Sequence, residues 1–260
     1  MSNTSTSCKR LVKSKSGLRI IPANENERSP FELAEPEWIP DEDSPVCMEC
    51  EEKFDFLKRR HHCRRCGRVC CAGCCNARLA LPRMCFLDPV RVCSPCAATT
   101  TLENRFYHHH LKSLLSGAIL TMSSDSRKSE AILSSCRLTP DHRYLQIQQP
   151  DVSLNLPIHK LTAMHVSKGR SCSDSDEAIE SSGADDATNP GFFETDADRD
   201  LNCVVLTYKS GGAEAGLMEE AEVRLSAPSE AAPSAYAFLK ALQQAALMAM
   251  EARHVIGTGK

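Results

Sequence analysis

The C-terminal half of the chain alternates apolar and polar residues in short runs, a pattern typical of β-strands. Seven such runs can be read, at 118–122, 132–138, 144–149, 153–158, 161–166, 201–208 and 221–225. Beyond them the apolar residues Leu239, Leu242, Ala246 and Met250 recur at helical spacing. This spacing places them on one face of a helix, so the sequence predicts seven strands followed by one amphipathic helix.

That order of elements is the one found in a pleckstrin-homology-like β-barrel, where a C-terminal capping helix plugs one open end. We therefore expect such a domain over residues 117–256, preceded by a helical spacer at 101–116 that Gly117 ends. Residues 168–200 interrupt the strands and are rich in Ser, Asp and Glu. Their composition predicts a disordered acidic insert.

The first part of the chain reads differently. Residues 1–36 are polar and carry an early basic run, which predicts a flexible basic tail. This tail is interpreted either as a solvated linker or as an auxiliary attraction to an anionic membrane. The apolar supply of residues 37–100 is thin for a domain of this size, so something other than a hydrophobic core must stabilise it.

Cysteine supplies that stabilisation. Eleven of the 15 cysteines lie between Cys47 and Cys96, and eight of them form C-x-x-C pairs. The pairs are Cys47/Cys50, Cys63/Cys66, Cys71/Cys74 and Cys93/Cys96. No apolar export signal opens the sequence, so we expect a reducing cytosol, where such a cluster indicates metal binding rather than disulfides. Eight thiolates are enough for two tetrahedral Zn²⁺ ions per chain.

A dense group of cations lies between the cysteine pairs. The segment 58–68 has no acid and contains two histidines, His61 and His62. Its six cations are Lys58, Arg59, Arg60, Arg64, Arg65 and Arg68. The whole chain has a net charge of −3, so the basic character is local. Guanidinium groups at this density favour a polyanionic ligand. The alternatives are a solvated charged face and a nucleic-acid surface.

Three motifs in this region resemble those of the FYVE zinc finger family. They are W-x-x-D at Trp38–Asp41, the basic R-R-H-H-C-R-R-C-G run at Arg59–Gly67, and R-V-C at Arg91–Cys93. The fold class is then α+β: a small cross-braced two-zinc finger at 37–100, followed by the barrel-like domain. The resemblance assigns Cys47, Cys50, Cys71 and Cys74 to one zinc, and Cys63, Cys66, Cys93 and Cys96 to the other. Cys70 and Cys75 adjoin proposed ligands, so a shift of register stays open.

The ligand that the resemblance implies is phosphatidylinositol 3-phosphate. Bidentate contacts with its phosphate are expected from four arginines, Arg59, Arg60, Arg64 and Arg91. His61 and His62 would donate to the phosphate or the inositol, and Asp41 would accept from the inositol hydroxyls. Phe56 and Leu57 are expected to insert into the bilayer, the alternative being that Phe56 packs inward.

These expectations describe a non-catalytic membrane adaptor in the cytoplasm, peripheral on early endosomes and vesicles. The resemblance further implies a role in cell adhesion and motility through focal-adhesion turnover, with endosomal or focal-adhesion proteins as partners of the C-terminal domain. Dimerisation is left open. The rivals are a RING-like ubiquitin ligase, which also cross-braces two zincs, and a zinc-dependent nucleic-acid binder. No aromatic ladder interleaves the cations, so no nucleic-acid partner is expected.

Overall fold

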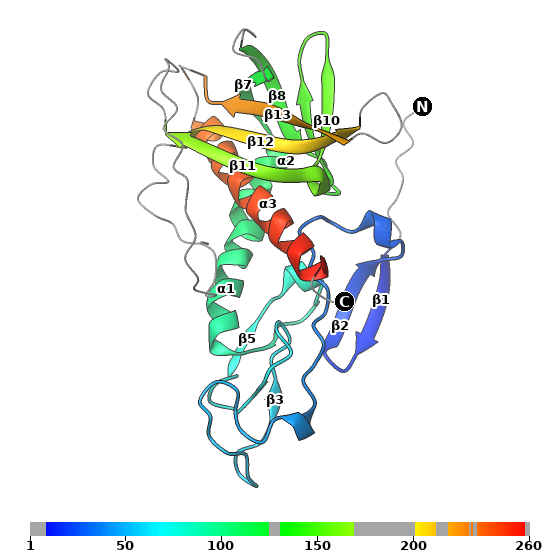
Figure 1. The fold of residues 1–260 in the computed structure, drawn as a ribbon, viewed down its shortest axis with the longest axis vertical. Coiled ribbons are helices and arrows are strands. Elements are labelled where there is room, and N and C mark those ends of the chain that lie inside the picture. Colours follow the sequence, from blue (N-terminus) through cyan, green and yellow to red (C-terminus); the bar gives the residue numbers. More distant parts are fainter. Residues whose placement is uncertain are drawn as a thin grey trace.

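The computed structural model describes residues 9–124, 131–168, 201–211, 218–228, 230 and 233–257. In Figure 1 the cysteine-rich segment occupies the lower part of the molecule, and a curved sheet with a long helix across it forms the upper part. Two buried clusters correspond to these parts. None of the described helices is both long and apolar enough to cross a membrane.

The N-terminal segment contains a hairpin of β1 (Lys9–Ser14) and β2 (Gly17–Pro22). Gly17 has φ of +145°, and the ring of Phe86 lies 3.3 Å from where its Cβ would be, so the turn needs glycine. Further on, Phe31 is fully buried. The structure thus differs from the flexible tail expected for residues 1–36, within the described residues. The physical reason is that Phe31 supplies an apolar anchor which the polar composition of the segment conceals.

Small strands and turns build the finger. Strands β3 (His61–His62) and β4 (Val69–Cys70) pair with each other, as do β5 (Ala77–Leu79) and β6 (Val90–Val92). The finger also contains 3-10 turns at Asp41–Asp43 and Pro82–Met84, and a third such turn, Glu25–Glu27, lies in the N-terminal segment before it. Such short elements bury little surface, so the cysteine groups between them carry the architecture.

A continuous helical run joins the two parts. Helix α1 (Ser94–Arg105) begins with Pro95 in its first turn, passes through a π-helical turn at Phe106–His110, and continues as α2 (Leu111–Ser116). Gly117, at φ of +80°, ends it. The helix therefore includes the spacer expected at 101–116 and extends seven residues further toward the finger, from Ser94 to Thr100.

One antiparallel sheet of seven strands follows, in the order β10-β9-β8-β7-β13-β12-β11. The strands are β7 (Ala118–Ser124), β8 (Ile132–Leu138), β9 (Tyr144–Gln148), β10 (Ser153–Pro157), β11 (Leu161–Lys168), β12 (Leu201–Gly211) and β13 (Met218–Ser226). The expected strand count is therefore met. No closed barrel forms among the described strands, because the edges β10 and β11 are not paired with each other. A 3-10 turn at Ile158–Lys160 connects these two edges. The acidic insert expected at 168–200 lies outside the described residues, apart from Lys168.

Helix α3 (Pro233–Gly257) lies across one face of the sheet, as Figure 1 shows. Phe238, Leu239 and Leu242 are fully buried there and belong to the same core as Leu120, Leu145 and other inward residues of the strands. The amphipathic spacing expected from the sequence thus places its apolar face on the sheet. The far end of the helix reaches the finger, where Ala252 belongs to the cysteine-rich cluster.

Candidate metal centre and anion-binding surface

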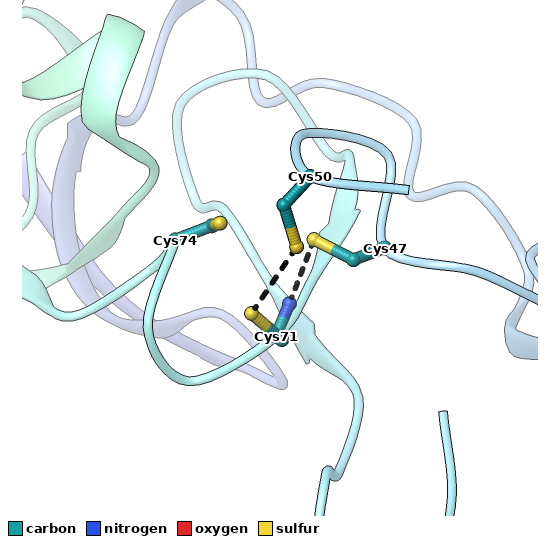
Figure 2. Close-up of side chains that lie close together, drawn as sticks. All are labelled: Cys47, Cys50, Cys71 and Cys74. Atoms are coloured by element: carbon teal, nitrogen blue, oxygen red, sulfur yellow. Dashed lines mark hydrogen bonds between the residues drawn. The ribbon is translucent and has the colours of Figure 1, made fainter. Parts of the chain in front are cut away.

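Four thiols come together in the first cysteine group, from Cys47, Cys50, Cys71 and Cys74. Figure 2 shows their sulfur atoms converging from two separate loops. The Sγ atoms of Cys50 and Cys71 are 3.9 Å apart, and the backbone N–H of Cys71 donates to Cys47 Sγ at 3.2 Å. Burial opposes ionisation of Cys47, but backbone N–H groups outweigh it and lower the pKa of this thiol to about 6. Cys47 is therefore prepared to bind a cation as a thiolate.

The second group consists of Cys63, Cys66, Cys93 and Cys96. The Sγ atoms of Cys66 and Cys93 are again 3.9 Å apart. Zn–S bonds of about 2.3 Å in a tetrahedron place sulfur atoms about 3.8 Å from each other, so both groups fit zinc. The two sets interleave along the chain, in the cross-brace that the sequence analysis expected.

Three further cysteines of the finger stand outside both groups. Cys70 and Cys75 are fully buried, and Cys85 is half-buried. Burial raises the pKa of Cys70 to about 12, which keeps this thiol protonated at neutral pH. The grouping therefore favours Cys71 and Cys74 over the shifted register.

A glycine fixes the position of the W-x-x-D segment. Gly67 has φ of +76°, and a Cβ there would clash with the carbonyl oxygen of Glu37. Next to it, the N–H of Ile39 donates to the carbonyl of Gly67 at 3.2 Å. This close approach brings the segment with Trp38 and Asp41 beside the basic signature, the run Arg59–Gly67, so the two motifs form one surface.

The cations of the basic run divide into two sets. Lys58 pairs with Glu52, Arg65 with Glu103, and Arg68 with Glu49. In contrast, Arg59, Arg60 and Arg64 form no salt bridge with any acid among the described residues. Only three of the six cations are therefore neutralised by the protein itself. The other three are among the phosphate contacts that the sequence analysis expected.

Stacked rings order part of this surface. The ring of His62 stacks on Trp38 at 4.4 Å, and the guanidinium of Arg64 lies over the same indole at 4.9 Å. Arg64 also donates to the carbonyl of His62 at 2.6 Å, and His62 Nε2 lies 3.8 Å from a carboxylate oxygen of Asp41. Three expected site residues, Asp41, His62 and Arg64, are thus brought together, and Trp38, for which no role was expected from the sequence, contacts two of them. Nearby, Arg60 donates to the carbonyl of Ser44 at 3.1 Å and lies over the ring of Phe54.

Strand β6 completes the surface. The carbonyl of Arg91 accepts from the backbone N–H of Arg64 at 3.0 Å, and its guanidinium donates to the carbonyl of Cys75 at 2.5 Å. Burial, with Arg91 and Arg64, lowers the pKa of His61, so this imidazole is neutral at pH 7. Arg78 was not among the residues expected from the sequence; it pairs with Arg91 in the ladder of β5 and β6 and adds to the positive field on Arg64. The signal available was a single Arg in the short apolar run A-R-L, thirteen residues before Arg91.

The loop before the signature presents two apolar side chains to solvent. Phe56 is 85% exposed and Leu57 is 87% exposed. A turn holds them there, since the carboxylate of Asp55 accepts the backbone N–H groups of Leu57 and Lys58, each at 2.7 Å. The alternative in which Phe56 packs inward is therefore wrong for this structure. Adjacent exposed side chains of this size favour contact with an apolar phase.

Comparison with protein families divides the chain at the same place as the fold. Residues 37–102 match the FYVE zinc finger model. Residues 105–180 match a model described as the C-terminus of zinc finger FYVE domain-containing protein 21. A FYVE finger binds two zinc ions, in agreement with the two groups of four thiols. The first match ends within α1, close to the end expected at residue 100.

Individual relatives resemble the finger alone. The mouse phosphatidylinositol-3,5-bisphosphate 3-phosphatase MTMR4 is 49% identical over 59 residues, which is 23% of this chain and 5% of that protein. Mouse zinc finger FYVE domain-containing protein 16 is 45% identical over 73 residues, 28% of this chain and 5% of that protein. The chain thus spans about one twentieth of the length of these curated relatives. Among solved structures, the LM5-1 FYVE domain from Leishmania major is 36% identical over 30% of this chain and 86% of that one, with a TM-score of 0.24. Residues 37–102 of this chain are a FYVE zinc finger, and the residues after it resemble the C-terminal part of zinc finger FYVE domain-containing protein 21.

Proposed function

We propose that the chain is a membrane adaptor that binds phosphatidylinositol 3-phosphate through its FYVE finger. The observation that carries the proposal is the set of unpaired arginines beside the exposed pair Phe56 and Leu57. A phosphomonoester carries a charge of about −1.5 to −2 and offers three acceptor oxygens, which guanidinium groups match. The arginines then bind the headgroup while the apolar pair enters the bilayer.

Energetics support a joint contribution of these two features. Each of the two side chains contributes roughly 1.5–3 kcal/mol if fully buried in the bilayer. Basic residues near an anionic leaflet add about 1 kcal/mol each. Neither contribution alone gives tight binding, so selectivity for the headgroup and insertion into the membrane act together.

The assigned contacts are those named from the sequence. Arg59, Arg60, Arg64 and Arg91 face the phosphate, His61 and His62 donate, and Asp41 accepts from the inositol. Arg78 joins them through its position opposite Arg91. With these contacts the adaptor would be a peripheral protein on early endosomes and vesicles.

The C-terminal domain would present partners at that membrane. We propose that it is a pleckstrin-homology-like module, which its strand order and its terminal helix support. Its role in adhesion and motility, and its focal-adhesion partners, follow from the resemblance alone. The adaptor is proposed to be non-catalytic; its finger has a cationic surface where a RING-like ligase would need an apolar groove.

The test is vesicle sedimentation of the full chain against a panel of phosphoinositides. We expect binding to phosphatidylinositol 3-phosphate to exceed binding to the other monophosphates by at least about ten-fold, the effect of one or two charge-assisted bonds. A matched control is Arg224→Gln, which removes an exposed charge from the sheet. Equal binding to all phosphoinositides, or no binding, would contradict the proposal. A ubiquitin-transfer assay with the same protein tests the ligase alternative: transfer of ubiquitin would support it, and no transfer would argue against it.

A further inference from the structure

A second group of cations lies away from the finger, where the N-terminal segment meets the sheet. A cavity of about 350 Å³ is lined there by Asn26, Arg28, Pro30, Arg143 and His159. The first three follow β2, Arg143 precedes β9, and His159 lies in the turn between β10 and β11. Three segments that are distant in the sequence thus converge on one space. Its volume is at the lower end of the range of ligand pockets, about 300–1,000 Å³.

The walls of this cavity are held in place by the protein. Phe31 is fully buried and packs edge-to-face on Phe106 with ring centroids 5.3 Å apart. The ring of His142 stacks on Phe31 at 5.7 Å, and its Nδ1 lies 3.1 Å from the hydroxyl of Ser29. On the other side of Arg28, the side chain of Asn24 caps the 3-10 turn at Glu25–Glu27. These contacts fix the segment that contributes Arg28, so the cavity does not depend on a ligand to form.

Positive charge accumulates around the cavity. Arg143, Lys160 and Arg253 form no salt bridge among the described residues. Arg253 donates instead to the carbonyl of His159 at 2.9 Å, which brings a further guanidinium from α3 to this site. Burial, followed by Lys160, Arg143 and Arg253, lowers the pKa of His159. Three cations without an acid partner among the described residues therefore lie at or near the cavity.

The nearby acids compensate this charge only in part. Glu32 lies 3.8 Å from Arg28 Nε, and burial raises the pKa of its carboxyl group. Asp141 is occupied locally, since one of its carboxylate oxygens accepts the backbone N–H of Arg143 and the hydroxyl of Thr139. Glu25 and Glu27 lie on the 3-10 turn, where Glu25 is exposed and Glu27 is half-buried. Arg28 thus has an acid partner in Glu32, whereas Arg143 forms no salt bridge among the described residues, and an anion in the open space would balance the remaining positive charge.

We propose that this cavity is a second anion-binding site, which takes a phosphate monoester borne by a lipid headgroup or by a soluble phosphate ester. A phosphate monoester has more charge and more acceptor oxygens than a carboxylate. It can accept from the guanidinium groups of Arg28 and Arg143 and from the imidazole of His159 at the same time. The chain would then recognise two phosphate groups, one at the finger and one at the seam between the N-terminal segment and the sheet.

The first experiment measures binding of inorganic phosphate to the full chain by isothermal titration calorimetry in a phosphate-free buffer. The double variant Arg143→Gln with His159→Gln should bind at least about ten-fold more weakly, because it loses charge-assisted bonds. Arg64→Ala, in the finger, and the matched control Arg224→Gln should retain this binding. Arg143→Lys, which keeps the charge, should recover part of it. Urea unfolding of each variant separates loss of the site from loss of the fold.

The second experiment identifies the source of the phosphate. Vesicles of phosphatidylcholine with phosphatidic acid are sedimented with Arg64→Ala protein, with and without the two pocket substitutions. Binding that the pocket substitutions remove supports the lipid source. Phosphate binding lost in calorimetry without any change in sedimentation supports the soluble source. If folded pocket variants match their parent proteins in both measurements, the site does not exist, whatever the outcome for the finger.

Discussion

Arg65, one of the cations in the basic signature, donates to the carboxylate of Glu103 on helix α1 at 2.7 Å. The same carboxylate accepts from Arg83 at 2.5 Å, and Arg83 also contacts Glu251 on α3 at 2.7 Å. Arg83 is only 1% exposed. A buried network of charges therefore joins the finger, the connecting helix and the C-terminal helix. The finger is not an appendage on a flexible linker.

We expect Glu103→Ala to destabilise the whole protein. The substitution leaves Arg83 and Arg65 with only the more exposed Glu251 as an acid partner among the described residues, and breaking such a buried network costs up to about 3–5 kcal/mol. Urea unfolding monitored by circular dichroism measures the loss. The control Glu220→Ala removes an exposed acid of β13 and should leave the free energy of unfolding unchanged. Equal stabilities for the two variants would mean that the network contributes nothing.

Neighbouring arginines of the signature should give opposite phenotypes. Arg64→Ala removes a guanidinium that faces the proposed ligand, so affinity for phosphatidylinositol 3-phosphate vesicles should fall about ten-fold or more while two zinc ions stay bound. Arg65→Ala should lower the free energy of unfolding instead, because Arg65 contacts Glu103. Sedimentation and unfolding are measured on both proteins. An Arg64→Ala protein that keeps its full affinity would place the headgroup elsewhere.

Removing the exposed apolar pair Phe56 and Leu57 should weaken binding to membranes but not binding to a soluble headgroup. Phe56→Ala with Leu57→Ala loses roughly 1.5–3 kcal/mol of insertion free energy per side chain, which weakens vesicle binding about ten-fold or more. Affinity for a soluble short-chain headgroup should hardly change, since no bilayer is present. Leu133→Ala, which removes an exposed Leu from β8, is the control. Equal losses in both assays would rule out insertion.

Much of the finger was predictable because its functional residues follow one another at short, regular spacings in the sequence. C-x-x-C pairs and the run from Arg59 to Gly67 specify ligands and cations by type and distance, and the structure groups the eight thiols as expected. The sequence did not predict which arginines form salt bridges within the protein and which do not. Glu103 and Glu251 lie far from Arg65 in the sequence, and only the packing of α1 and α3 brings them to it.

The N-terminal segment shows a second limit of sequence patterns. One residue, Phe31, anchors a polar stretch in the core of the C-terminal domain, and a single aromatic residue creates no periodic signal. In the sheet, alternation predicted the strands but not closure. Closure requires pairing of β10 with β11, which depends on the path of the chain through the 3-10 turn at Ile158–Lys160. Patterns of period two carry no information on that path.

Cys63→Ser should release zinc and unfold the finger. The mutated ligand belongs to a closed site, and zinc binding contributes on the order of 10 kcal/mol to the folding of such a module. Interleaved ligands should extend the loss to the other ion, so we expect fewer than two zinc ions per chain by atomic absorption. Cys203→Ser, at a buried cysteine outside both groups, should retain two. Two bound ions and normal vesicle binding in the Cys63→Ser protein would show that the ligand set is different.

A histidine at the seam should make the stability of the protein depend on pH. Burial, together with Lys9, lowers the pKa of His142 below its ordinary value of about 6.5, and Asp141 opposes the shift. As pH falls below about 6.5, the unfolded chain takes up a proton that folded His142 resists, so this group's contribution is complete above that pH and is lost below it. His61 and His159 have lowered pKa values too and act in the same direction.

His142→Asn suits the left-handed backbone at φ of 63° and removes one of these groups. The free energy of urea unfolding, measured from pH 8 to pH 5.5, should therefore fall less steeply in this variant than in the wild type. His165→Asn, at an exposed site on β11, should keep the wild-type slope. Identical slopes for wild type and His142→Asn would show that the contact of His142 with Ser29 and Phe31 does not resist protonation.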